Sequence, residues 1–392
     1  MTALVAFLAV PCTLWVHGQV HRRLATAPET LLHSLECGDD NLRELVEDCM
    51  PSRTDSTSFW VGCKWDIYGL CQTSLMFTLR NARRILFSTV RHERRLHVLS
   101  DGGTIGLDFA FLSSAKRSAQ LESYPADKPV VIMSHGMLGD ATSEYLIFLT
   151  EKLLLLEFIV IVIVSRGNGN LSLTSTKSFH WFDTSDYHEA LLYLRTEHFR
   201  CNPFVTVGFS LGAGLMLKYM SQDHLHKQVS VDLAVCISPP WDIKKKSPYF
   251  SFWSCLLVVP LKLFILRHYA MLKRKDISLW QILSTFNLEE WDELFCRAYG
   301  MKDVEEYYSL GSAITTAHLI TTPTISISAI DDAICSIEGK PTAPPNNLAL
   351  VTSHYGGHLG FPDSSLLQSW VDDFVVRLVL RRASQINNRL TI

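Results

Sequence analysis

The sequence has no excess of charge of either sign. It carries 36 Lys and Arg residues against 39 Asp and Glu residues, a formal net charge of −3. A protein that binds nucleic acid contacts phosphates with a clear surplus of Lys and Arg on one face. We therefore expect no nucleic-acid partner.

Paired cysteines are also missing. The Cys residues form no C-x-x-C pair and no ladder of Cys and His at zinc-binding spacing. Because free Cys behaves as a small hydrophobic residue, we expect ordinary buried or half-buried thiols, no disulfide framework and no metal site. The ten cysteines lie at positions 12, 37, 49, 63, 71, 201, 236, 255, 296 and 335.

The N-terminus has no charge between Thr2 and Val16, and its first basic cluster is His21 to Arg23. The segment lies at the lower edge of the length of a membrane-spanning helix. It lacks the basic stretch and the cleavage site of a secretory signal. We predict an uncleaved membrane anchor over residues 1–20, with a cleaved signal or a buried helix as alternatives. The downstream arginines favour a catalytic domain on the cytoplasmic side.

The remainder of the chain is organised around short apolar runs. Leu96 to Leu112 alternates around Asp101-Gly102-Gly103, which predicts a hairpin. Continuous apolar runs alternating with helix-like stretches predict parallel strands covered by helices on both faces. The fold class is thus α/β, with a mostly parallel sheet and an antiparallel N-terminal hairpin. The runs are 130–133, 158–164, 205–207, 233–237, 324–330 and 348–351.

One interval interrupts this alternation. Residues 243–320 contain no clear strand pattern but include the apolar stretch Phe250 to Leu266, which Pro260 and Lys262 interrupt. We predict a helical cap over a pocket; a transmembrane helix and a packed helical layer are the alternatives. The expected organisation is the anchor, a helical and irregular lead-in over 21–92, and a catalytic domain over 93–385 that contains the cap.

A nucleophile elbow is indicated at Ser210. The sequence VTVGFSLGAGLMLKY from Val205 to Tyr219 places G-x-S-x-G between a strand pattern and a helix pattern. Glycines two residues before and after the serine allow a turn so sharp that larger side chains would collide. An inert serine in a tight turn is the alternative.

The predicted fold requires an acid and then a histidine after later strands, in the order Ser, Asp, His. The run 324–330 leads into Asp331 and Asp332, and the run 348–351 leads into a loop with His354 and His358. We select Asp332 from its spacing to the following apolar pair and keep Asp331 as the alternative. We select His358 because two glycines precede it and keep His354 as the alternative.

An oxyanion hole needs two backbone N–H donors. Leu211 follows the nucleophile, and Met137 lies in the glycine-bearing loop after the strand at 130–133, so these two residues are the predicted donors. His135 to Asp140 also matches H-x-x-x-x-D, a pattern sometimes taken to indicate an acyltransferase. Two residues at one spacing arise easily by chance.

With these motifs, the chain resembles the membrane-anchored subfamily of α/β-hydrolases formed by abhydrolase-domain proteins one, two and three, with EMB8-like and YheT-like esterases. The likeness spans roughly residues 60 to 375. Two positions depart from the family pattern, Ala333 in place of proline and Val164 in place of asparagine. Arg166 is interpreted as structural, with substrate binding as the alternative. The matching motifs, besides the elbow, lie at 68–73, 99–104, 134–136, 165–167, 328–332 and 356–361.

The resemblance implies the triad Ser210, Asp332 and His358, no cofactor, a single-pass anchor in an endomembrane such as the endoplasmic reticulum, and hydrolysis of ester bonds in phospholipids or acylglycerols. The family is usually described with its catalytic domain on the noncytoplasmic side, whereas Arg22 and Arg23 favour the cytoplasmic side. Two alternatives stay open for function: a lipid-binding or receptor-like protein without turnover, and an acyltransferase that uses the same serine.

Overall fold

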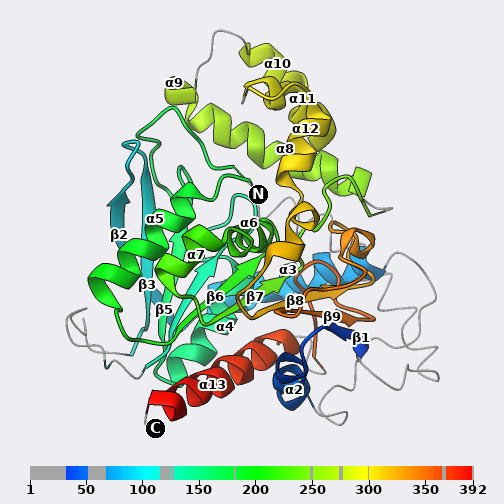
Figure 1. Ribbon diagram of the computed structural model, residues 1–392. Helices are drawn as coiled ribbons and strands as arrows, with labels where there is room; N and C mark the ends of the chain where they lie inside the picture. Colours follow the sequence, from blue (N-terminus) through cyan, green and yellow to red (C-terminus); the bar gives the residue numbers. More distant parts are fainter. Residues whose placement is uncertain are drawn as a thin grey trace.

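The computed structural model describes residues 32–51, 68–114, 125, 128–180, 182–247, 250–272, 277–298, 300–363 and 368–390. The predicted anchor over residues 1–20 lies outside the described residues. Figure 1 shows a central sheet with helices on both sides and a group of further helices above it.

The described strands form one nine-stranded sheet in the order β1-β9-β8-β7-β6-β4-β5-β3-β2. The six central strands, β9, β8, β7, β6, β4 and β5, pair in parallel. Antiparallel strands complete the two ends of the sheet, β1 beside β9 and the β2–β3 hairpin beside β5. The α/β prediction with a mostly parallel sheet and an antiparallel hairpin is confirmed. The strands are β1 (Leu32–Cys37), β2 (Val90–Val98), β3 (Thr104–Leu112), β4 (Val130–Ser134), β5 (Ile159–Val164), β6 (Phe204–Phe209), β7 (Leu233–Ile237), β8 (Thr324–Ala329) and β9 (Leu348–Ser353).

Alternate residues of each central strand contribute to two separate cores. In β4, Val131 and Met133 belong to the core with the helices on one face, whereas Val130 and Ile132 belong to the core on the other. This follows from the period of two in a strand, which points successive side chains to opposite faces. A strand covered on both sides is therefore apolar throughout, which is why these runs are continuous rather than alternating.

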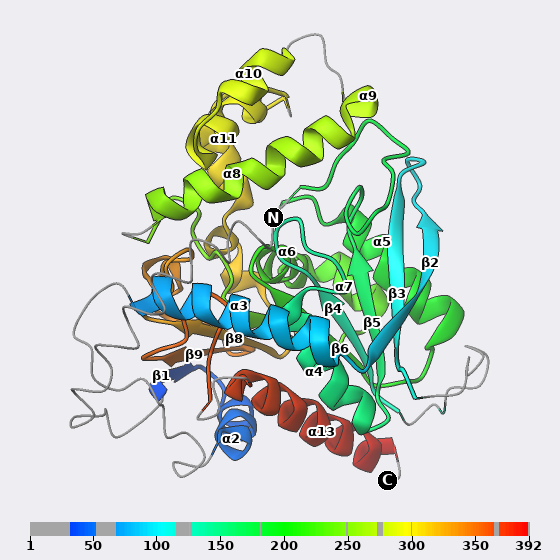
Figure 2. The same cartoon turned by 180° about the vertical axis from the view of Figure 1, so that it is seen from behind.

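The covering helices lie in two layers, which Figures 1 and 2 show from opposite sides. One layer contains α2 (Asp40–Cys49), α4 (Glu144–Leu155) and α13 (Trp370–Leu390), with α3 (Tyr68–Phe87) packed beside α4. The other contains α5 (Ser185–Tyr193), α6 (Leu211–Met220) and α7 (Asp223–Val229).

Strand β1 lies within residues 21–92, for which the sequence predicts helical and irregular structure and no strand. It pairs antiparallel with β9, with Leu35 opposite Val351. The helix that follows β1 in the chain, α2, packs on α13. Because the partner strand lies about 300 residues further along the chain, no local pattern around Leu35 reveals this pairing.

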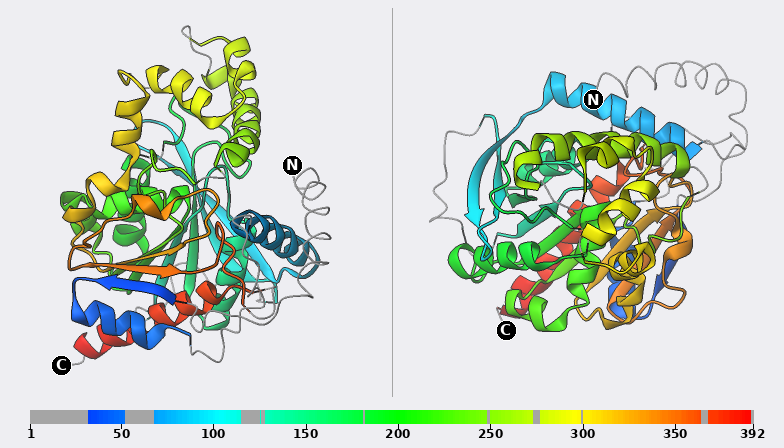
Figure 3. Two further views of the ribbon diagram at one scale, coloured as in Figure 1. Left: turned by 90° about the vertical axis from the view of Figure 1, so that its right-hand side faces the viewer. Right: turned by 90° about the horizontal axis from the view of Figure 1, so that it is seen from above.

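Five α-helices of the described chain lie between β7 and β8, and we call them the cap. Figure 3 (left) shows them on the opposite side of the molecule from α2 and α13. They pack around their own apolar cluster, which includes Val258, Ile265 and Trp291. The cap helices are α8 (Phe250–Arg267), α9 (Tyr269–Leu272), α10 (Leu279–Ser284), α11 (Leu288–Ala298) and α12 (Val304–Gly311).

Candidate active site

Ser210 occupies a strained turn between β6 and α6. Its φ of 52° and ψ of −119° lie outside the regions that L-residues normally adopt. The flanking glycines make this turn possible: a Cβ on Gly208 would lie 2.7 Å from Ala213 Cα, and one on Gly212 would lie 2.5 Å from the carbonyl oxygen of His135. The sharp turn therefore places the serine at the end of β6 and at the N-terminus of α6.

The three predicted triad side chains come together. His358 Nε2 lies 2.8 Å from Ser210 Oγ, and its Nδ1 lies 2.9 Å from Asp332 Oδ2. The Asp332 side chain is 1% exposed and that of His358 is 8% exposed. Asp332 Oδ1 also accepts hydrogen bonds from the backbone N–H groups of Ile334 and Cys335, each at 2.8 Å. The acid is thus fixed by its own loop and oriented toward the imidazole.

The neighbouring Asp331 has a different environment. Its Oδ1 accepts a hydrogen bond from the Gly357 N–H at 2.8 Å. Burial, and to a smaller extent the nearby charge of Asp332, together raise the pKa of Asp331 to about 7. Of the two aspartates, Asp332 contacts the ring of His358, and Asp331 contacts the backbone of the histidine loop. His354 lies against Tyr355, with ring centroids 6.1 Å apart.

The two predicted oxyanion donors border the same cavity as Ser210. Leu211 is the first residue of α6, where backbone N–H groups have no partner within the helix. The loop with Met137 is held by Tyr145, whose hydroxyl oxygen accepts the Gly136 N–H at 2.9 Å. This arrangement offers positive partial charge beside the serine hydroxyl.

His135, the histidine of the H-x-x-x-x-D pattern, has both ring nitrogens engaged in structural contacts. Its Nδ1 lies 2.7 Å from the Gly136 carbonyl oxygen, and its Nε2 accepts the Ser165 N–H at 3.1 Å. Burial lowers the pKa of His135, so the ring is neutral with its proton on Nδ1. It connects the loop after β4 to the loop after β5.

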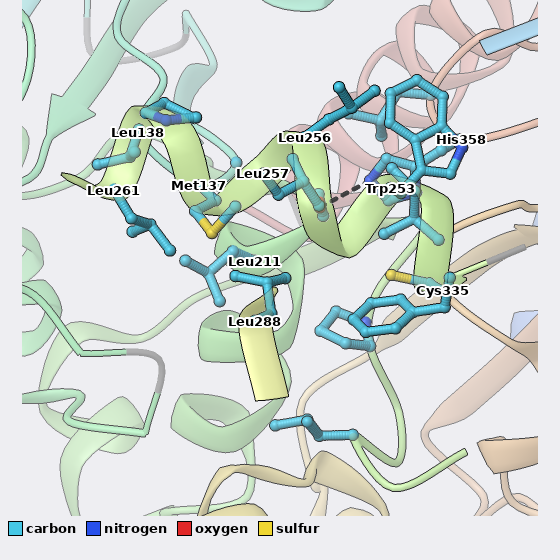
Figure 4. Close-up of a pocket in the computed structure, with 18 of the residues that line it drawn as sticks. Met137, Leu138, Leu211, Trp253, Leu256, Leu257, Leu261, Leu288, Cys335 and His358 are labelled. Carbon is cyan, nitrogen blue, oxygen red and sulfur yellow. Dashed lines mark hydrogen bonds between the residues drawn. The ribbon is translucent and has the colours of Figure 1, made fainter. Parts of the chain in front are cut away.

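A large apolar cavity opens over the triad, with a volume of about 410 Å³. It lies between the sheet edge and the cap, and α3 contributes a third wall. Figure 4 shows cap side chains such as Leu257 gathered near Met137, Leu211 and His358. At its cap end, the hydroxyl of Tyr308 donates to Asp292 at 2.9 Å, and burial raises the pKa of that carboxyl to about 7. A volume of this size accommodates a chain of apolar groups.

Arg166 has a structural environment, as interpreted from the sequence. It is 2% exposed and donates to Asp101 at 2.9 Å, to Asp186 at 2.7 Å and to Ser175 at 2.8 Å. These contacts tie the loop after β5 to the β2–β3 hairpin and to α5.

Within the described part of the chain, one group brings three possible metal ligands together: Asp332, Cys335 and His358, with ligand atoms within 4.8 Å of one another. Two of the three already form the hydrogen bond between carboxylate and imidazole. A metal ion there would compete with that hydrogen bond, and the observed geometry is that of a carboxylate orienting an imidazole.

Comparison with known proteins gives a consistent group of relatives. Residues 125–346 match the family model Hydrolase_4, described as serine aminopeptidase, S33. Phospholipase ABHD3 of Bos taurus is 22% identical over 83% of this chain and 78% of its own length. The putative esterase YheT of Escherichia coli is 27% identical over 68% and 79%, and a monoacylglycerol lipase of Saccharomyces cerevisiae is 24% identical over 91% and 88%. A solved esterase of Pyrococcus furiosus matches with a TM-score of 0.46 at 16% identity, over 74% of this chain and 91% of that one.

Proposed function

Because this chain belongs to the Hydrolase_4 family (serine aminopeptidase, S33) and is a carboxylic ester hydrolase with the α/β-hydrolase fold, we propose that it cleaves ester bonds of lipids through an acyl-enzyme formed on Ser210. The observation that carries the proposal is the chain of contacts from Ser210 Oγ through the His358 ring to Asp332.

The proposed mechanism has two halves. His358 Nε2 takes the hydroxyl proton as Ser210 Oγ attacks the ester carbonyl, and then gives that proton to the leaving alcohol. Asp332 holds the proton of Nδ1 and stabilises the imidazolium. The Met137 and Leu211 N–H groups bind the oxyanion. Water, activated by the same imidazole, then releases the fatty acid and restores the serine.

Two observations support a lipid substrate. The cavity beside Ser210 is bordered mainly by apolar side chains from the cap, α3 and the loop after β4. The similar proteins from Bos taurus and Saccharomyces cerevisiae are named a phospholipase and a monoacylglycerol lipase. An apolar acyl chain gains free energy on entering such a cavity, whereas a polar substrate would lose hydration there.

We also propose that the protein works at a membrane, held by the uncharged N-terminal segment from Thr2 to Val16, which is close to the length of a membrane-spanning helix.

The cap offers a second apolar surface. In the described part of the chain, one helix, α8, is long and apolar enough to span a bilayer, and 28% of it is buried. Its outward face carries Phe252 and Leu263, 52% and 55% exposed. Such a face suits contact with lipid.

This localisation predicts a simple fractionation result. The full-length chain should stay with membranes through high salt and alkaline carbonate washing, because both leave an apolar anchor in place, and should be released by detergent. Immunoblotting of pellet and supernatant measures it. Complete release by salt alone would contradict an anchored protein.

The function itself is tested by assaying full-length protein in detergent micelles on a diacyl phospholipid, a monoacylglycerol and a short soluble ester. Fatty acid release by the wild type and its loss in Ser210→Ala support the proposal. Transfer of the acyl group to an added lysolipid in preference to water would indicate the acyltransferase alternative. Saturable lipid binding without any product would indicate the binding protein.

A further inference from the structure

The loop that carries His358 has an unusual backbone. Gly357, Leu359 and Phe361 all have positive φ, at 53°, 65° and 43°. For the two non-glycine residues such a conformation costs about 1 kcal/mol or more each, so surrounding contacts must hold it. The position of the imidazole depends on these contacts because His358 lies between two left-handed residues.

One of these contacts comes from α3, far away in the sequence. The backbone N–H of His358 donates to Thr73 Oγ1 at 2.8 Å. Thr73 is 8% exposed and borders the same cavity as Ser210 and His358. The hydroxyl oxygen of Thr73 therefore fixes the backbone of the residue whose ring contacts the serine.

Two further residues on the same face of α3 contact this loop. Met76, 2% exposed, packs so closely that a Cβ on Gly360 would lie 3.2 Å from it. Arg80 donates to the Leu359 carbonyl oxygen at 3.5 Å and to Asp372 of α13 at 2.7 Å. Spacings of three and seven residues place Thr73, Met76 and Arg80 along one side of the helix. The Arg80–Asp372 pair is buried on both sides and anchors α3 against α13.

We propose that Thr73 is a positioning residue for His358: its hydroxyl oxygen holds the histidine loop so that the ring stays between Ser210 and Asp332. This inference rests on the proposed role of His358 as base. The α3 helix then belongs functionally to the active site, although it precedes the strands that carry the triad. Loss of the contact affects the chemical step more than substrate binding, because the ring's alignment matters most in the transition state.

The test compares Thr73→Val, which keeps the shape but removes the acceptor, with Thr73→Ser, which keeps the acceptor. We expect Thr73→Val to lower kcat by about 10- to 100-fold with KM changed by less than about 3-fold, and Thr73→Ser to keep kcat within about 3-fold of the wild type. The matched control is Thr78→Val on the same helix, where the hydroxyl donates to the Ser74 carbonyl oxygen at 2.8 Å. It should keep wild-type kinetics.

Wild-type kcat in Thr73→Val would overturn the inference, and so would equal losses in Thr73→Val and Thr73→Ser, because the hydroxyl oxygen would then not matter. If Thr73→Val does not fold, Thr73→Ala removes the same acceptor without adding a methyl group, and its comparison with Thr73→Ser decides. An inactive wild type would contradict the proposed function. An active wild type with an unaffected Thr73→Val would contradict this inference alone.

Discussion

Asp332→Asn should lower kcat by about 10³- to 10⁴-fold while the protein stays folded. The carboxylate accepts the Nδ1 proton of His358 at 2.9 Å, and an amide in its place can present an N–H group that favours the wrong tautomer of the ring. The same side chain accepts two backbone N–H groups, and the asparagine oxygen can keep these. Steady-state hydrolysis of a soluble ester measures the effect, with circular dichroism as the check on folding.

Asp331→Asn is the matched control. It removes the neighbouring carboxyl, but its amide oxygen can still accept the Gly357 N–H that Asp331 accepts at 2.8 Å. Because the pKa of Asp331 is raised to about 7, mainly by burial, the carboxyl is only partly ionised at neutral pH, and the neutral amide removes only part of a charge from the loop. We expect kcat within about 10-fold of the wild type, since no ring contact is lost. The reverse result, with Asp331→Asn inactive and Asp332→Asn active, would mean that Asp331 is the acid that orients His358.

Leu257→Trp should discriminate between long and short acyl chains. Leu257 is half-buried on α8 and borders the cavity over the triad (Figure 4). A larger side chain fills room that acyl methylenes would occupy, and each buried methylene contributes about 0.8 kcal/mol. Displacing two methylenes should thus lower kcat/KM for a long-chain ester by about 15-fold, since about 1.4 kcal/mol corresponds to a factor of ten. A two-carbon ester of the same alcohol should react as with the wild type.

Leu263→Trp provides the control on the same helix. Leu263 is 55% exposed and does not border the cavity, so the added volume extends into solvent or lipid. Its ratio of long-chain to short-chain kcat/KM should equal that of the wild type. Equal ratios in all three proteins would show that the acyl chain does not occupy this cavity.

The sharp turn at Ser210 and the approach of Asp332 and His358 to it could be predicted because they follow from local patterns. The turn at Ser210 needs small residues at fixed offsets, and a site at the end of a parallel strand follows directly after an apolar run. The same reasoning gave the two-layer α/β arrangement, because strands such as β4 send alternate residues into two cores. These features depend on neighbours in sequence.

The other features depend on pairing across the whole chain. Strand β1 becomes a strand only beside β9, and Thr73 becomes part of the site only where α3 meets the His358 loop. The motif that contains Thr73 was visible in the sequence, but nothing local indicated which group its hydroxyl would contact. Asp331 and Asp332 are adjacent and chemically identical, so their different contacts arise from the conformation of the loop after β8.

Labelling by a fluorophosphonate probe tests whether Ser210 is an activated nucleophile, because the probe reacts with a serine that its neighbours have activated. Full-length wild type and Ser210→Ala are treated in detergent micelles and examined by in-gel fluorescence, with circular dichroism on both. We expect strong labelling of the wild type and none of Ser210→Ala. No labelling of a well-folded wild type, or equal labelling of both proteins, would contradict this expectation.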